Sequence, residues 1–166
     1  VPAGEHCTPG EPVRYWNAAQ ADAASDAEDG DGDVEALLRD AVRLRLQADV
    51  PVGVFLSGGI DSSLVAALAC EVSDAPVRTF SIGFDDELYD ESAKARAVAA
   101  QLGTRHSETR FTGAELRALV PTLAEAFDEP FADASALAML LLCRVASAEI
   151  KVALSGDGGD ELFGGY

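Results

Sequence analysis

The chain of 166 residues is long enough to bury one hydrophobic core but too short for two full-sized domains. Its 29 acidic residues against 12 basic ones give a net charge of -17, which opposes binding to nucleic acid and to anionic membranes. No apolar run approaches the roughly 20 residues that cross a bilayer, and the first residues lack the pattern of a signal peptide. We therefore expect a cytoplasmic protein without membrane or nucleic-acid partners.

The first 32 residues are poor in periodic apolar side chains, and from residue 18 onward they are mostly Ala, Asp, Glu, Gly and Ser. Such a composition cannot bury enough apolar surface to order a segment. We interpret residues 1–32 as a tail that contains an acidic linker, and we place the structured domain at residues 33–166.

Apolar residues recur at helical spacing from Val34 to Leu44, which predicts an amphipathic helix with Asp33 as its N-cap. A fully buried strand is then predicted at 52–56, and further strands at 77–82, 105–109 and 151–154. They alternate with helices predicted at 62–73, 91–102, 114–127 and 136–148. Strands that alternate with helices of this length indicate an α/β fold, a Rossmann-like parallel sheet with helices on both faces. Ligands bind such sheets at the C-terminal ends of the strands.

Two loops rich in Gly and Asp, residues 57–63 and 155–161, each follow a buried strand, so both are expected at the same edge of the sheet. Gly58 and Gly59 let the backbone approach a ligand closely, and the amides around Asp61 lie at a helix N-terminus, where anions bind. A tight turn that only caps the next helix is the alternative for each loop. We predict instead that the loops converge on one phosphate-containing ligand.

Neither loop contains a lysine, and the chain has no Gly-x-x-x-x-Gly-Lys-Ser/Thr sequence, so the first loop is not a Walker A loop. Magnesium must then supply the charge that neutralises the phosphates. Asp61 from the first loop and Asp160 from the second offer the hard oxygen ligands that this ion prefers. His6 and His106 have no neighbouring set of ligands, and we expect surface or capping roles for them.

These motifs resemble those of the asparagine synthetase family within the PP-loop ATP pyrophosphatases. The segments that carry the resemblance follow the family's order and are PVGVFLSGGIDSS at 51–63, TFSIGF at 79–84, YDES at 89–92, LGT at 102–104, DEPFAD at 128–133 and LSGDGGDELFGGY at 154–166. The resemblance covers residues 33–166, and residues 14–16 resemble the junction that follows the family's glutaminase domain. It implies an adenine nucleotide alpha hydrolase-like fold.

The resemblance implies an ATP-dependent ligase that makes asparagine from aspartate through a β-aspartyl-AMP intermediate, with release of pyrophosphate and AMP. Ammonia derived from glutamine is the implied second substrate. The residues implied to bind ATP are Leu56, Ser57, Gly58, Gly59, Asp61, Ser62, Ile82, Ser155 and Gly156. The implied magnesium ligands are Asp61 and Asp160. Asp157 is the implied catalytic residue, at a position where well-studied relatives carry Glu.

The chain also departs from the complete family pattern. It lacks the N-terminal cysteine of the glutaminase and ends before the helices that carry a catalytic lysine, so we expect little activity from it alone. Residues 133–140 differ from the pattern of close relatives. The difference is compatible with a sister enzyme that adenylates another carboxylate, as β-lactam synthetases and lasso-peptide cyclases do, and equally with a helix face repacked without a change of function. A catalytically silent nucleotide-binding module is the other alternative. A homodimer is one assembly state to be expected of the full-length protein.

Overall fold

The structure is a computed structural model that describes residues 13–14, 31–86, 88–129, 132–133 and 135–165, with the backbone alone for 31–33. The chain divides by its internal contacts into two units, Val1–Val34 and Glu35–Tyr166. Most of the first unit, including the predicted linker and His6, lies outside the described residues. The sheet and the helices that pack on it belong to the second unit.

Four strands form one parallel sheet: β1 (Val52–Phe55), β2 (Arg78–Phe84), β3 (Arg105–Phe111) and β4 (Val152–Leu154). Their order is β3-β2-β1-β4, and every neighbouring pair is parallel. β2 and β3 stay in register to Phe84 and Phe111, so both run two residues beyond their predicted ends. The predicted parallel α/β sheet is confirmed.

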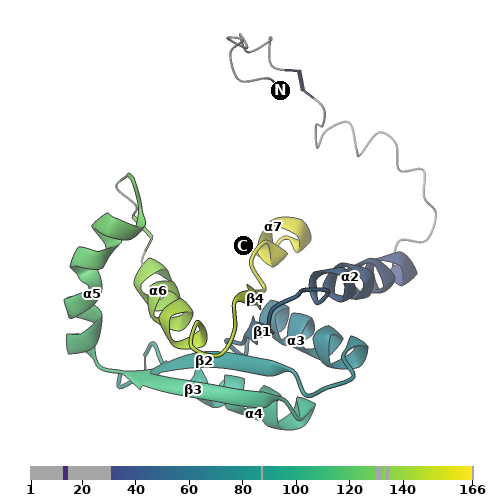
Figure 1. Ribbon diagram of the computed structural model, residues 1–166, viewed down its shortest axis with the longest axis horizontal. Helices are drawn as coiled ribbons and strands as arrows, with labels where there is room; N and C mark the ends of the chain where they lie inside the picture. Colours follow the sequence, from purple (N-terminus) through teal and green to yellow (C-terminus); the bar gives the residue numbers. More distant parts are fainter. Residues whose placement is uncertain (1–12, 15–30, 87, 130–131, 134, 166) are drawn as a thin grey trace. The chain divides into compact units, whose positions relative to one another are not determined.

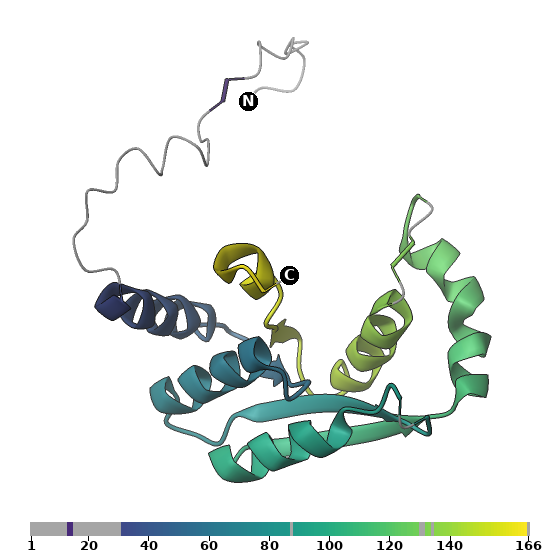
Figure 2. The same ribbon diagram turned by 180° about the vertical axis from the view of Figure 1, so that it is seen from behind.

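The helices are α2 (Asp31–Arg45), α3 (Ile60–Val72), α4 (Ser92–Leu102), α5 (Gly113–Ala126), α6 (Ser135–Ala146) and α7 (Gly159–Phe163). Figures 1 and 2 show α4 and α6 on opposite sides of the sheet. The N-cap prediction for Asp33 was wrong, because α2 begins two residues earlier, and acidic residues are favourable throughout a first turn. Within the described ranges, no helix combines the length and the apolar character that a membrane span requires.

Successive residues of β1 face opposite layers of the molecule. Val54 and Leu56, which are 0% and 1% exposed, pack in the core formed with α2, α3 and α4. Each such burial contributes about 1.5–3 kcal/mol. Gly53 faces the other layer, where a Cβ would lie 2.8 Å from the Phe80 ring and 2.9 Å from Ile150 Cδ1. Glycine thus lets β1 pack closely against a second apolar cluster, formed by Phe80, Ile150 and residues of α6.

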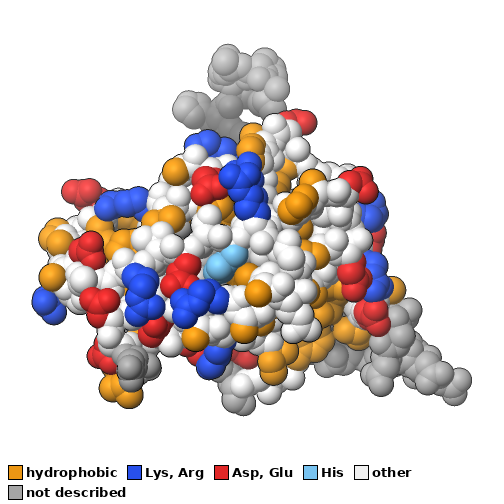
Figure 3. All heavy atoms as spheres, turned by 90° about the horizontal axis from the view of Figure 1, so that it is seen from below, with side chains coloured by type: hydrophobic (Ala, Val, Ile, Leu, Met, Phe, Trp, Pro, Cys, Tyr) orange, Lys and Arg blue, Asp and Glu red, His pale blue; other side chains and the backbone are white. Residues whose placement is uncertain are grey.

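The face of β2 that lies toward α4 is polar. Thr79 Oγ1 lies 2.9 Å from His106 Nδ1, and Ser81 Oγ lies 3.2 Å from His106 Nε2. Thr79 and Ser81 are 0% and 4% exposed. His106 is half-buried and joins β3 to β2, so its ring has a structural role that the expected surface or capping role did not include. Burial lowers the pKa of His106 below its usual value. Figure 3 shows the histidine at the surface of this face, with positive and negative side chains gathered on one side of it.

Candidate functional site

A cavity of about 700 Å³ opens where β1, β2 and β4 end, a volume typical of small-molecule sites. The predicted site residues that line it are Leu56, Ser57, Gly59, Asp61, Ser62, Ile82, Ser155, Gly156, Asp157 and Asp160. Gly58 is the one predicted site residue outside this lining. The parallel sheet brings these residues together because its strand ends meet at one edge.

The first loop, residues 57–62, is held by its own serine hydroxyls. The Ser57 amide donates to Ser62 Oγ at 3.2 Å, and the two hydroxyl oxygens lie 2.9 Å apart. The Gly59 amide donates to Ser57 Oγ at 3.2 Å. No side chain of the described residues caps α3, so the amides of its first turn are left for an anion.

Gly58 is turned toward α4. Its φ is 83°, and a Cβ there would lie 2.6 Å from Lys94 Cβ and 2.7 Å from the Ala95 amide nitrogen. Both the left-handed backbone and the close approach require glycine. The structure therefore gives Gly58 a packing role against α4, while its assignment to ATP binding stays a prediction.

The second loop, residues 155–161, packs directly on the first. A Cβ on Gly156 would lie 2.7 Å from the Ser62 amide nitrogen, and a Cβ on Gly159 would lie 2.6 Å from Asp61 Cγ. Any side chain at either position would force the loops apart. The expectation that both loops lie at the same edge of the sheet is therefore confirmed.

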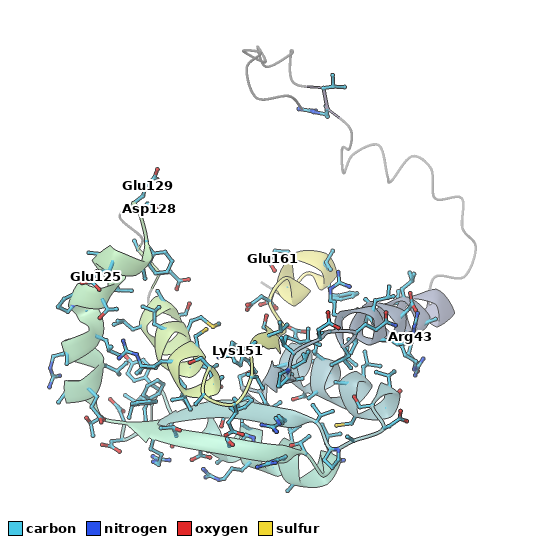
Figure 4. The ribbon with its side chains drawn as sticks, in the orientation of Figure 1. Arg43, Glu125, Asp128, Glu129, Lys151 and Glu161 are labelled. Atoms are coloured by element: carbon cyan, nitrogen blue, oxygen red, sulfur yellow. The ribbon has the colours of Figure 1, made fainter. Side chains whose placement is uncertain are left out.

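Five carboxylates line the cavity, and they belong to Asp61, Glu91, Asp157, Asp160 and Glu161. Among the described residues of the lining, none is lysine or arginine. Lys151 precedes β4 and so lies at the opposite end of that strand from the second loop, whereas Glu161 lies on α7 (Figure 4). A polyphosphate could bind here only together with a cation that offsets these carboxylates.

Asp61 and Asp160 are suited to hold such a cation. The Asp61 carboxylate lies against Gly159, the residue before Asp160, so the two acids come from loops in contact. The described residues contain no group of three or more His, Cys, Asp or Glu side chains arranged for a metal. Magnesium is commonly bound through one or two carboxylates, with water and substrate phosphates completing its shell. The donor set therefore fits magnesium bound together with a phosphate ligand.

Asp157 is exposed at the cavity, where its carboxylate Oδ2 accepts a hydrogen bond from the Ser155 hydroxyl at 2.9 Å. This bond fixes the side chain toward the start of its own loop. Asp128 and Glu129, from another of the motifs quoted above, do not line the cavity, and Figure 4 shows them beyond the end of α5. Residues 130 and 131 of that motif lie outside the described residues.

Sequence reasoning missed the walls contributed by two other segments. Tyr89 and Glu91 line the cavity from the turn between β2 and α4. The residues contributed by α6 are Ser135, Ala138, Met139 and Leu142. Their helical spacing is visible in the sequence, but the same spacing describes a helix that packs only on a core. Part of the unusual segment 133–140 therefore belongs to the cavity wall.

Residues 33–166 match the family model described as asparagine synthase. A Bacillus subtilis protein named asparagine synthetase (glutamine-hydrolysing) 1 is 39% identical over 134 residues, which are 81% of this chain and 21% of the relative. A Methanocaldococcus jannaschii relative with an asparagine synthetase name is 43% identical over 131 residues, which are 78% of this chain and 25% of the relative. The chain thus spans between 20% and 25% of the length of these curated relatives.

Two solved structures share the fold. The NH3-dependent NAD synthetase from Campylobacter jejuni has a TM-score of 0.53 at 17% identity, covering 81% of this chain and 60% of its own. The NMN synthetase from Francisella tularensis has a TM-score of 0.58 at 20% identity, covering 84% of this chain and 59% of its own. At such identities the likeness concerns the fold alone, and it agrees with the expected adenine nucleotide alpha hydrolase-like sheet. By its match to the family model and to these relatives, the chain belongs to the asparagine synthase family.

Proposed function

We propose that this domain binds ATP with magnesium and forms the adenylating site of an asparagine-synthesising ligase. The contact between loops 57–62 and 155–161 carries the proposal, because two glycine-rich loops from neighbouring parallel strands line one cavity. The amides of the first loop and of the α3 N-terminus would bind the pyrophosphate. Leu56 and Ile82, with Ser155 and Gly156, would contact the adenosine.

In the proposed reaction, the side-chain carboxylate of aspartate attacks the α-phosphorus of ATP. A bond forms between carboxylate oxygen and phosphorus as the bond to pyrophosphate breaks. Ammonia, supplied from glutamine in the full-length protein, then attacks the acyl carbon, and AMP leaves. The amides at the start of α3 would stabilise the charge that develops on the pyrophosphate. Magnesium, held by Asp61 and Asp160, would neutralise phosphate charge when bound.

Asp157 is the proposed catalytic residue of the adenylation step. It lines the same cavity as the first loop, and the Ser155 hydroxyl orients its carboxylate at 2.9 Å. An acid that is held in place costs less entropy when it positions a reacting group.

Adenylation of another carboxylate is the second candidate function. The observation that favours it is the small and apolar part of the wall at Ala138 and Met139. Such a wall offers no charge to select the second carboxylate of an amino-diacid such as aspartate.

Pyrophosphate exchange into ATP by the full-length protein distinguishes the candidates. The first candidate predicts exchange that aspartate stimulates and other carboxylates do not. Stimulation by a different carboxylate, with indifference to aspartate, would establish the second. Binding of ATP without exchange under any carboxylate would instead identify a nucleotide-binding module without adenylating activity.

Asp61→Ala tests the nucleotide site itself. We expect the variant of the full-length protein to lose measurable Mg-ATP binding in calorimetric titration while its far-UV circular dichroism is unchanged, because Asp61 acts through the metal. Asp74→Ala removes an exposed acid from the turn after α3, outside the cavity, and serves as the matched control. Equal affinities for the wild type and Asp61→Ala would refute the assignment.

A further inference from the structure

Arg110, near the end of β3, binds three neighbouring segments. Its Nη1 lies 3.0 Å from Asp90 Oδ2 and donates to Ser92 Oγ at 3.3 Å. Its Nη2 donates to the Phe84 carbonyl at 2.5 Å. Phe84 is the last residue of β2, and Ser92 is the first residue of α4. One guanidinium therefore holds both ends of the turn that leads from β2 into α4.

Asp90 is the acceptor at the centre of these contacts. Its Oδ1 accepts hydrogen bonds from the Ser92 amide at 3.1 Å and from the Phe84 amide at 3.4 Å. Bonds from the Ser92 hydroxyl and amide, with smaller contributions from Arg110 and Phe84, lower the pKa of Asp90 to about 2. The carboxylate is thus charged near neutral pH, and its side chain is only 16% exposed. A guanidinium that contacts this carboxylate and donates to two further acceptors fixes geometry as well as charge.

The surroundings leave this cluster little freedom. A Cβ on Gly83 would lie 3.1 Å from both Asp90 Oδ1 and Ser92 Oγ. These polar groups therefore pack directly on the backbone of β2 at Gly83. Arg96 of α4 donates to Ser92 Oγ at 3.1 Å and also pairs with a Glu108 carboxylate oxygen at 2.5 Å. Ser92 itself is 1% exposed.

The first turn of α4 also forms part of the candidate site. Ser92 and Ala95 line the cavity together with Glu91. On the same turn, Lys94 and Ala95 are the residues against which Gly58 packs, with no room for a methyl group between them. A shift of this turn would therefore displace loop 57–62 through its contact at Gly58.

We propose that Arg110 is a positioning residue, which fixes the first turn of α4 and through it the shape of the phosphate-binding loop 57–62. Arg110 does not belong to the cavity lining, so it acts through other residues and not on a ligand. This positioning role rests on the proposed function only in identifying the phosphate ligand of the loop as ATP. Its structural core, the coupling of Arg110 to loop 57–62, can be measured without any nucleotide.

The test is amide hydrogen exchange of the full-length protein without ligand, comparing the wild type with Arg110→Ala. Loss of bonds to charged groups should raise the exchange rate in peptides covering 57–62 and 85–95 by about tenfold. Exchange in α5 and α6 should stay within about twofold of the wild type, since those helices lie outside the network. Arg110→Lys should restore part of the protection, because one ammonium cannot reach all three acceptors as a guanidinium does. Arg105→Ala, at the other end of β3, is the control and should leave loop 57–62 unchanged.

Unchanged exchange of 57–62 in Arg110→Ala, or an equal rise in every helix, would overturn the positioning role. If Arg110→Ala does not fold, Asp90→Asn removes the ion pair with little change of shape and must produce the same local rise. Mg-ATP titration of the same variants adds the functional readout, where we expect about tenfold weaker binding in Arg110→Ala. A wild type that does not bind Mg-ATP, combined with the local rise in exchange, would refute the proposed function and leave the positioning role standing.

Discussion

The two loops of the cavity differ in what holds them. The first, residues 57–62, is fixed by hydroxyl bonds between Ser57 and Ser62 and by the packing of Gly58 on α4. The second, residues 155–161, rests on the first through its glycines, and its Asp157, Asp160 and Glu161 are exposed. The comparison indicates that the first loop is held by its own hydrogen bonds and by packing on α4, whereas the position of the second loop depends on the first.

Alanine at a glycine of each loop should separate these roles most strongly. Gly58 and Gly158 have φ values of 83° and 92°, but a Cβ would collide with α4 only at Gly58, since nothing lies within 4 Å at Gly158. We expect Gly158→Ala to cost about 1 kcal/mol of unfolding free energy, the strain of a left-handed alanine. Gly58→Ala should cost about 2–4 kcal/mol, because overpacking is added to the strain. Urea unfolding of both variants measures the difference, and equal costs would mean that the contact with α4 is dispensable.

Removal of one serine hydroxyl from each loop should have a smaller effect in the same direction. Ser62 is 7% exposed and its hydroxyl bonds to the Ser57 amide and hydroxyl, so Ser62→Ala should cost about 1–2 kcal/mol. Ser155→Ala removes a single bond to the exposed Asp157 and should cost less than about 0.5 kcal/mol. Thermal melts of the two variants give the ranking, and a reversed order would contradict the view that the first loop is the rigid one.

The pH dependence of stability should be independent of both loops. Burial lowers the pKa of His106 from its usual 6.5, so the unfolded chain takes up the proton more readily than the folded one. Stability is then fully present above about pH 6.5 and falls as the pH drops through the folded pKa. Urea midpoints at pH 7.5 and 5.5 should show a small decrease in the wild type. The decrease should persist in Ser62→Ala and shrink in His106→Gln; a decrease that His106→Gln leaves intact would point to other groups.

Much of the fold could be predicted from the sequence because strands and helices alternate along the chain, and β1 and β4 are apolar runs followed by glycine-rich loops. The first and last strands indicated the position of both loops, since Ser-Gly follows shortly after each strand, at 57–58 and at 155–156. Helix α7 was not predicted, because its five residues lie between Gly158 and Gly164, both with positive φ, and a stretch so rich in glycine is typical of a loop.

The candidate site was predictable only where local chemistry marks it. Loop residues such as Asp61 and Asp157 follow strand ends, and they line the cavity as expected. Glycine is required at position 58 because of its contact with Lys94 and Ala95. Met139 lines the cavity because of the way α6 packs on β2. Both are tertiary relationships that residue spacing does not contain.

The central claim is that the two loops form one nucleotide site, and amide exchange with and without Mg-ATP tests it most directly in the full-length protein. Peptides covering 57–62 and 155–161 should become protected together, with the same dependence on nucleotide concentration. Protection confined to one of the loops, or two different concentration dependences, would contradict the claim.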